Sequence, residues 1–173
     1  DCILHVPFVL KAPNLPEGKR VKALTEHVDI PKTVMELLDV KPAIDWIIHG
    51  DNLLPAIQGE KIKDAVFADG GHEKSMRDRF DRPIYDDRGG RRRLATGGKQ
   101  RVYKEFPDTM ARTKMIRTED WKLVVRETGG DELYDLKNDP DEMKNLYGDP
   151  QYNDIVLDLQ RRMLNWCLRT DTD

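Results

Sequence analysis

The chain has 173 residues, of which 38% are hydrophobic and 35% charged, and its formal net charge is -3. This is the composition of a polar but globular protein, long enough for one hydrophobic core with a small subdomain. No apolar run approaches the roughly 20 residues of a membrane span, and no signal-peptide pattern is present.

The first predicted element is a strand over residues 3–10. This almost continuous apolar run is typical of a strand covered on both faces of a parallel sheet. Pro7 removes one ladder donor from it, so that point is an edge, a bulge or the first residue of the strand. The sequence opens at Asp1 directly before this run and without an initiator Met, so we expect a fragment of a longer protein.

A helix is predicted from Asp29 to Val40. Asp29 is interpreted as its N-cap rather than as a metal ligand or a catalytic acid, because aspartate is favoured at helix starts. Val34, Leu37 and Leu38 have the i, i+3, i+4 spacing of one buried stripe.

A second buried strand is predicted over residues 63–68, stopped by Asp69 and two glycines. From residue 71 to residue 112 the sequence has no clear period and is rich in glycine and basic residues. A loop of this length is uncommon in a compact domain unless it is functional or mobile.

Regular structure is predicted to return at residue 113. Residues 113–117, 121–127 and 132–136 have the pattern of three strands, and their short connections favour an antiparallel meander. Asp139 followed by Pro140 and Glu142 resembles a capping box and predicts a short helix.

A longer helix is predicted to open at Asp149 and Pro150. Its apolar stripe recurs at i, i+4, i+8 and i+11, and it should pack across the meander; the stripe consists of Ile155, Leu159, Met163 and Trp166.

Five segments, in order, resemble the sulfatase family of the alkaline phosphatase superfamily. The most informative is E-L-Y-D-L-x-x-D-P-x-E-x-x-N-L, from Glu132 to Leu146. The others are the V-P-containing run before Lys11, V-D-I-P-K-T from Val28, G-D-N-L-L-P from Gly50 and M-I-R-T from Met115.

The resemblance implies an α/β fold: the C-terminal part of an alkaline-phosphatase-like sulfatase fold, with a small antiparallel sheet packed by a C-terminal helix. Residues 1–112 would form the tail of the catalytic α/β domain, including the long basic loop 71–112. Residues 113–173 would form the C-terminal subdomain.

The resemblance also implies the chemistry of the longer protein, which is hydrolysis of a sulfate ester. Sulfatases use a formylglycine made from Cys or Ser in a C/S-x-P/A-x-R motif, together with a divalent cation, usually calcium. The sequence contains no such motif. We therefore expect no catalytic residue, metal ligand or cofactor in this chain, which would supply fold stability and pocket walls.

Four residues are candidates for binding the substrate, a sulfated small molecule or glycan. His72 follows a predicted buried strand, at the sheet edge where ligands of α/β proteins collect. Arg91 and Arg92 could hold a sulfate through paired guanidinium hydrogen bonds, and Lys104 follows a tyrosine in the same loop. The alternative for all four is a loop that faces water.

Two other functional interpretations stay open. One is a phosphonate or phosphate ester hydrolase of the same superfamily, and the other is a free-standing, non-catalytic interaction module. The expected partner is the N-terminal catalytic part of the longer protein, or a second copy of the chain bound through Ile3 to Val9. Nucleic acid is not expected as a partner, because aromatic residues are not interleaved with the basic ones.

Overall fold

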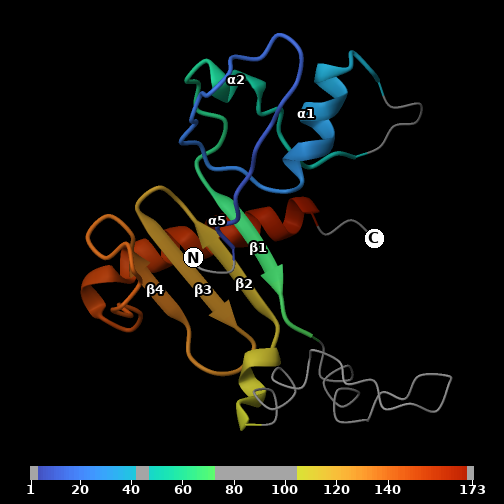
Figure 1. Cartoon of the computed structure of the whole chain (residues 1–173). Helices are drawn as coiled ribbons and strands as arrows, with labels where there is room; N and C mark the ends of the chain where they lie inside the picture. Colours follow the sequence, from blue (N-terminus) through green and yellow to red (C-terminus); the bar gives the residue numbers. More distant parts are fainter. Residues whose placement is uncertain (1–3, 42–46, 73–104, 171–173) are drawn as a thin grey trace, which may run out of the picture.

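The structure is a computed structural model that describes residues 4–41, 47–72 and 105–170. It has two parts (Figure 1): an upper part with two helices, and a lower part in which a four-stranded sheet lies against a long helix. The elements in chain order are α1 (Asp29–Leu37), α2 (Leu54–Ile57), β1 (Val66–Gly70), η1 (Pro107–Met110), β2 (Thr113–Arg117), β3 (Trp121–Arg126), β4 (Glu132–Asp135), η2 (Pro150–Tyr152) and α5 (Asn153–Thr170).

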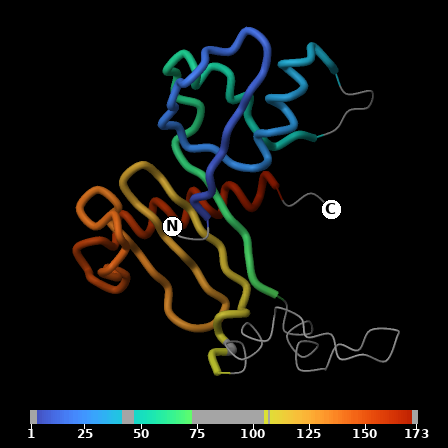
Figure 2. Tube along the Cα trace, viewed as in Figure 1, coloured from blue at the N-terminus to red at the C-terminus, as the bar shows by residue number. Residues whose placement is uncertain are grey.

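The lower part is an antiparallel sheet with the strand order β1-β2-β3-β4. Figure 2 follows the chain from the upper part down through β1 into the sheet and on to α5. The predicted three-strand meander is confirmed as β2, β3 and β4, in which Ile116 pairs with Leu123 and Leu123 with Leu133. Short turns between successive strands make this pairing local.

The predicted strand 63–68 is shifted, and its expected surroundings were wrong. Strand β1 begins at Val66 and pairs with β2 at the edge of the antiparallel sheet, so it is not the buried strand that was predicted. Only its first residue is buried. The domain boundary at residue 112 stays a prediction.

The core of the lower part lies between the sheet and α5. Ile116, Leu123 and Leu133 have no solvent exposure, and they cluster with Leu159 and Met163 of α5. The predicted helix and its stripe are confirmed, and the Asp149 carboxylate accepts a hydrogen bond from the Gln151 amide at the helix start. Burying each such side chain contributes about 1.5–3 kcal/mol, so this core holds the sheet and the helix together.

The predicted strand over residues 3–10 is wrong for the residues that the structure describes. Residues 5–10 have no regular secondary structure, and Phe8 and Val9 are 47% and 88% exposed. A strand needs a neighbour that supplies ladder hydrogen bonds, and no described strand lies next to this run in the sheet order.

Helix α1 forms as predicted but ends earlier, and the expected buried stripe was wrong. Val34 and Leu38 are 39% and 65% exposed, whereas Asp29 and Thr33 are buried. Asp29 lies inside the first turn, and the helix has no side-chain cap. The Asp29 carboxylate instead forms an ion pair with Lys63, which lies 34 residues further along the sequence.

The short helix predicted after Asp139 does not form. The Asp139 carboxylate accepts hydrogen bonds from the Met143 and Lys144 amides, which lie four and five residues on and beyond the two or three residues that an N-cap reaches. Glu142 has a φ of 56°, which no residue of a right-handed helix adopts. Its carboxylate instead binds Lys122 of β3 at 2.6 Å.

Candidate functional site

His72 lies directly after β1, where a tight turn fixes its backbone. Its amide donates a 2.8 Å hydrogen bond to the Met110 carbonyl of η1. Gly71 before it has a φ of +83°, and a Cβ at this position would lie 2.0 Å from the Ala111 carbonyl oxygen. Only glycine fits so close to another backbone, so the sequence places His72 beside η1.

The same edge of the sheet carries a charged and aromatic cluster. Lys114 Nζ lies 2.7 Å from an Asp69 carboxylate oxygen and 5.2 Å from the centre of the Trp166 ring. Trp166 stacks on Phe67 with ring centroids 4.9 Å apart. These contacts join β1, β2 and α5 near the turn that leads to His72.

Of the four predicted substrate-binding residues, His72 alone lies in the described ranges. Arg91, Arg92 and Lys104 lie outside the described residues. The hydrogen bond between His72 and Met110 brings the residues before and after the segment 73–104 to one edge of the sheet. The role of all four residues in binding stays a prediction.

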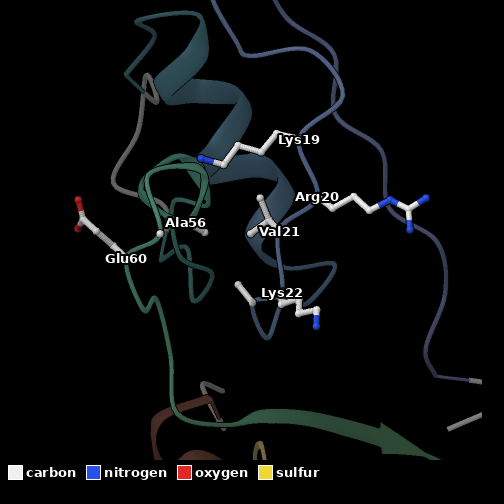
Figure 3. A pocket seen from close by; sticks show the side chains of 8 residues that line it. Lys19, Arg20, Val21, Lys22, Ala56 and Glu60 are labelled. Atoms are coloured by element: carbon white, nitrogen blue, oxygen red, sulfur yellow. The ribbon is translucent and has the colours of Figure 1, made fainter.

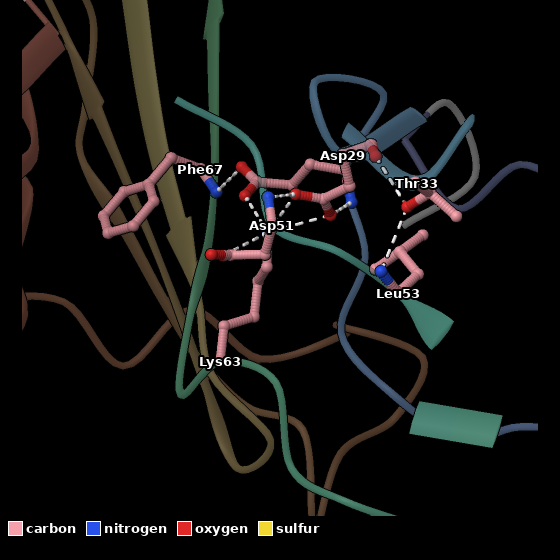
Figure 4. A network of polar contacts seen from close by, with 7 residues as sticks. Asp29, Thr33, Asp51, Leu53, Lys63 and Phe67 are labelled. Atoms are coloured by element: carbon pink, nitrogen blue, oxygen red, sulfur yellow. Dashed lines mark hydrogen bonds and ion pairs between the residues drawn. The ribbon is translucent and has the colours of Figure 1, made fainter. Parts of the chain in front are cut away.

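A largely buried charge network joins the upper part to the sheet (Figure 4), and no local sequence pattern predicted it. Lys63 Nζ contacts Asp29 at 2.7 and 2.8 Å, Glu26 at 2.9 Å and Asp51 at 3.4 Å. Burial lowers the pKa of Lys63, but its hydrogen bonds to Asp29 and Glu26 outweigh burial and raise the pKa above 10.5. The second Glu26 oxygen accepts a 2.7 Å hydrogen bond from the Phe67 amide of β1.

The network also organises the start of α1 and the segment before α2. Asp29 accepts hydrogen bonds from the Glu26 and Asp51 amides, and the Thr33 hydroxyl links the Asp29 carbonyl to the Leu53 amide. Each carboxylate in it has a named partner. We therefore assign it a structural role, in which the charges hold the upper part on β1.

A shallow depression opens in the upper part (Figure 3). Three of its lining residues, Lys19, Arg20 and Lys22, are basic. The others are Val21, Ala23, Ala56, Gly59 and Glu60. The side chains of Lys19 and Arg20 point in opposite directions in Figure 3. Because its cations do not converge, the depression is not built to hold an anion.

Metal-ligand side chains are not gathered within the described ranges, where no three His, Cys, Asp or Glu residues lie together in a way that could hold an ion. The helices of the same ranges include none that is long and apolar enough to cross a membrane.

The family described as "N-sulphoglucosamine sulphohydrolase, C-terminal" matches residues 99–168, which contain the whole E-L-Y-D-L segment. The sulfatase YidJ of Escherichia coli K12 is 26% identical over 167 residues, which are 96% of this chain and 27% of that protein. The chain resembles the C-terminal portion of a sulfatase.

A second relative of this sulfatase portion is the Delta 4,5-hexuronate-2-O-sulfatase of Bacteroides thetaiotaomicron. It is 25% identical over 177 residues, which cover 100% of the chain and 30% of that protein. The sulfatase portion therefore spans about a third or less of the length of these curated relatives.

The structure of the phosphonate monoester hydrolase of Silicibacter pomeroyi has the same fold as the sulfatase portion. It superposes with a TM-score of 0.60 at 20% identity, over 92% of this chain and 28% of that one. The expected fold class is confirmed: an alkaline-phosphatase-like fold that ends in an antiparallel sheet packed by a C-terminal helix.

Proposed function

We propose that the protein carrying this chain is a sulfuric ester hydrolase, and that this portion stabilises the fold and forms walls of the substrate pocket. The observation that carries the proposal is the match over residues 99–168, together with relatives whose names are those of sulfatases. Strand β4 at the centre of that segment contributes Leu133, which is fully buried against the neighbouring strand.

The pocket wall would be the sheet edge at His72. A loop held at both ends by a rigid scaffold commonly carries binding residues. The contacts of Lys114 and Trp166 supply that scaffold, and the segment that leaves it contains Arg91 and Arg92. A guanidinium group donates two parallel hydrogen bonds, which suits the oxygens of a sulfate. Lys104 would contribute a further positive charge.

The expected formylglycine and calcium would belong to other parts of the longer protein. The described residues do not offer a set of ligands for the ion, and the whole sequence lacks the formylglycine motif. We therefore derive no catalytic step from this chain. Its own contribution is to bind and orient the substrate.

The substrate class that we propose is a sulfated carbohydrate. The name of the Bacteroides relative, Delta 4,5-hexuronate-2-O-sulfatase, supports this class. A phosphonate ester is the second candidate, because the structure of a phosphonate monoester hydrolase superposes on nearly the whole chain. The cluster of arginines in the segment 73–104 fits either anion.

The test is turnover by the protein expressed from the complete reading frame. A chromogenic aryl sulfate and the matching aryl phosphonate are compared under the same conditions. We expect a higher kcat/KM for the sulfate, and a lower value after replacing Arg91 with Ala. Lys61→Ala, far from this segment in sequence, is the control. Preference for the phosphonate would overturn the proposal in favour of the second candidate.

A further inference from the structure

Helix α5 carries two apolar stripes on opposite sides. Leu159 and Met163 pack into the core against the sheet and are 2% and 6% exposed. Leu157, Leu164 and Leu168 are 62%, 58% and 71% exposed, and their spacing is close to whole turns, so they form one line along the helix. Because each residue turns the helix by about 100°, Leu157 lies about 200° from Leu159. The second stripe therefore faces away from the core.

The orientation of α5 is fixed by aromatic contacts near both of its ends. Trp166 stacks on Phe67 of β1, and the ring of Tyr152, directly before α5, lies 5.8 Å from that of Trp121 in β3. Arg161 interrupts the outer stripe, but a long basic side chain can lie along apolar surface with its charge in water. An exposed apolar line of this kind, bordered by charges, is typical of an interaction surface.

The charges beside the outer stripe favour one kind of partner. Asp154, Asp158 and Arg169 are exposed and lie close to one and three turns apart, so they share one flank of the helix. This flank is acidic toward the start of α5 and basic at its end. Asp158 also contacts Arg162 of its own helix at 3.7 Å, an exposed pair of the kind that contributes little. A helix with such a flank is complementary to a copy of itself that runs in the opposite direction.

We infer that the outer stripe of α5, formed by Leu157, Leu164 and Leu168, is a docking surface for the same helix of a second copy, antiparallel about a two-fold axis. With Leu157 opposite Leu168 of the second copy, the two Leu164 side chains lie near the axis. Asp154 of each copy then comes close to Arg169 of the other, and the two helix dipoles oppose each other favourably. A parallel pair would instead place like charges side by side.

A second copy fits this surface better than a membrane does. Helices that lie in a membrane interface carry mostly Lys and Arg on their polar face, whereas Asp154 and Asp158 border this stripe. Helix α5 has 18 residues and is about 27 Å long. One pair of helices of this length offers less than the roughly 1,200 Å² of a stable interface, so the dimer is reversible and depends on concentration.

The test is sedimentation equilibrium of the protein expressed from the complete reading frame. Leu164→Lys places a charge in the middle of the stripe, and Asn165→Lys, the same charge on the next exposed residue, is the matched control. Asp154→Lys places a lysine near Arg169 of the second copy, and adding Arg169→Glu restores opposite charges with reversed signs. Circular dichroism verifies that each variant folds; if Leu164→Lys does not fold, the charge reversal decides alone.

We expect a reversible dimer whose Kd rises at least about tenfold with Leu164→Lys and less than about twofold with Asn165→Lys. Asp154→Lys should raise the Kd about two- to fivefold, and the double substitution should restore it. A monomer at every concentration, or a dimer that Leu164→Lys does not weaken, would overturn the inference. So would a dimer that the charge reversal does not restore, or a monomer that instead adsorbs to phosphatidylcholine vesicles.

Discussion

The ammonium nitrogen of Lys63 lies 2.7 and 2.8 Å from the two carboxylate oxygens of Asp29, a side chain without solvent exposure. Removing one member of such a pair leaves an uncompensated buried charge. We therefore expect Lys63→Ala to lower the free energy of unfolding by about 3 kcal/mol in urea denaturation.

Lys61→Ala is the control for this prediction. Lys61 pairs with Asp64 at the surface, where both side chains are more than two-thirds exposed. Water and salt screen such a pair, so no measurable change in stability is expected. Equal effects of the two substitutions would contradict the structural role of the network.

The ion pair between Lys122 and Glu142 predicts a specific response to acid. Burial raises the pKa of Glu142, but several contributions together, of which the hydrogen bond from Lys122 is the largest, outweigh burial and leave the pKa below its ordinary value of 4.5. A carboxyl with a lowered pKa stabilises the folded state above its ordinary pKa, and this contribution is lost as the pH falls through the folded value.

The measurement is the difference in unfolding free energy between the unmodified chain and Glu142→Gln. We expect the difference to be largest near neutral pH and to shrink steadily below pH 4.5. Glu36→Gln, at an exposed position of α1, is the control and should give a small difference at every pH. A difference for Glu142→Gln that does not vary with pH would show that the pair does not form.

Two adjacent glycines give a matched test of the turn before His72. Gly71 has a φ of +83° and no room for a Cβ beside the Ala111 carbonyl, whereas a Cβ on Gly70 would meet no atom within 4 Å. Gly71→Ala should therefore destabilise the chain by about 2 kcal/mol or more, and Gly70→Ala by less than about 0.5 kcal/mol. Thermal or urea unfolding decides between them; similar losses would mean that the turn is not as close as described.

The 173-residue chain alone should not hydrolyse an aryl sulfate, with or without added calcium. The expectation follows from the sequence, which lacks the nucleophile motif of sulfatases. Release of the chromophore is measured against a heat-denatured sample. Turnover that rises with calcium concentration would show that the chain carries a catalytic centre of its own.

The exposed run between Leu4 and Val9 should make the 173-residue chain self-associate. Phe8 is 47% exposed, and covering that exposed half is favourable by roughly half of the 1.5–3 kcal/mol of a full burial. Light scattering should detect a dimer or a larger species, and Phe8→Lys should shift it toward the monomer. A monodisperse monomer at high concentration would contradict the prediction.

Local patterns predicted those elements whose partners are close in sequence. Strands β2, β3 and β4 follow one another through short turns, and the stripe of α5 with Leu159 and Met163 needs only the sheet beside it. The turn at Gly71 that holds His72 belongs to the same class, because a glycine pair after a strand is itself a local signal.

Two of the failures involve partners that lie far away in the sequence. The carboxylate of Asp29 was expected to cap the helix, but it pairs with Lys63, which lies 34 residues away. Glu142 was expected in a short helix, but its carboxylate accepts a hydrogen bond from Lys122, which lies 20 residues away. The run near Phe8 has the composition of a covered strand, but composition does not show whether a neighbouring strand is present.

The register of β1 and β2 pairs Gly70 with Thr113. The two ends of the intervening segment are therefore held side by side by the sheet. Lengthening a loop between two such fixed points costs only about 0.6 kcal/mol for each doubling of its length. Insertions and deletions between Gly70 and Thr113 can therefore accumulate while the paired strands keep their structure. Protein engineers can therefore exchange the sequence between these two residues among relatives without changing the paired strands.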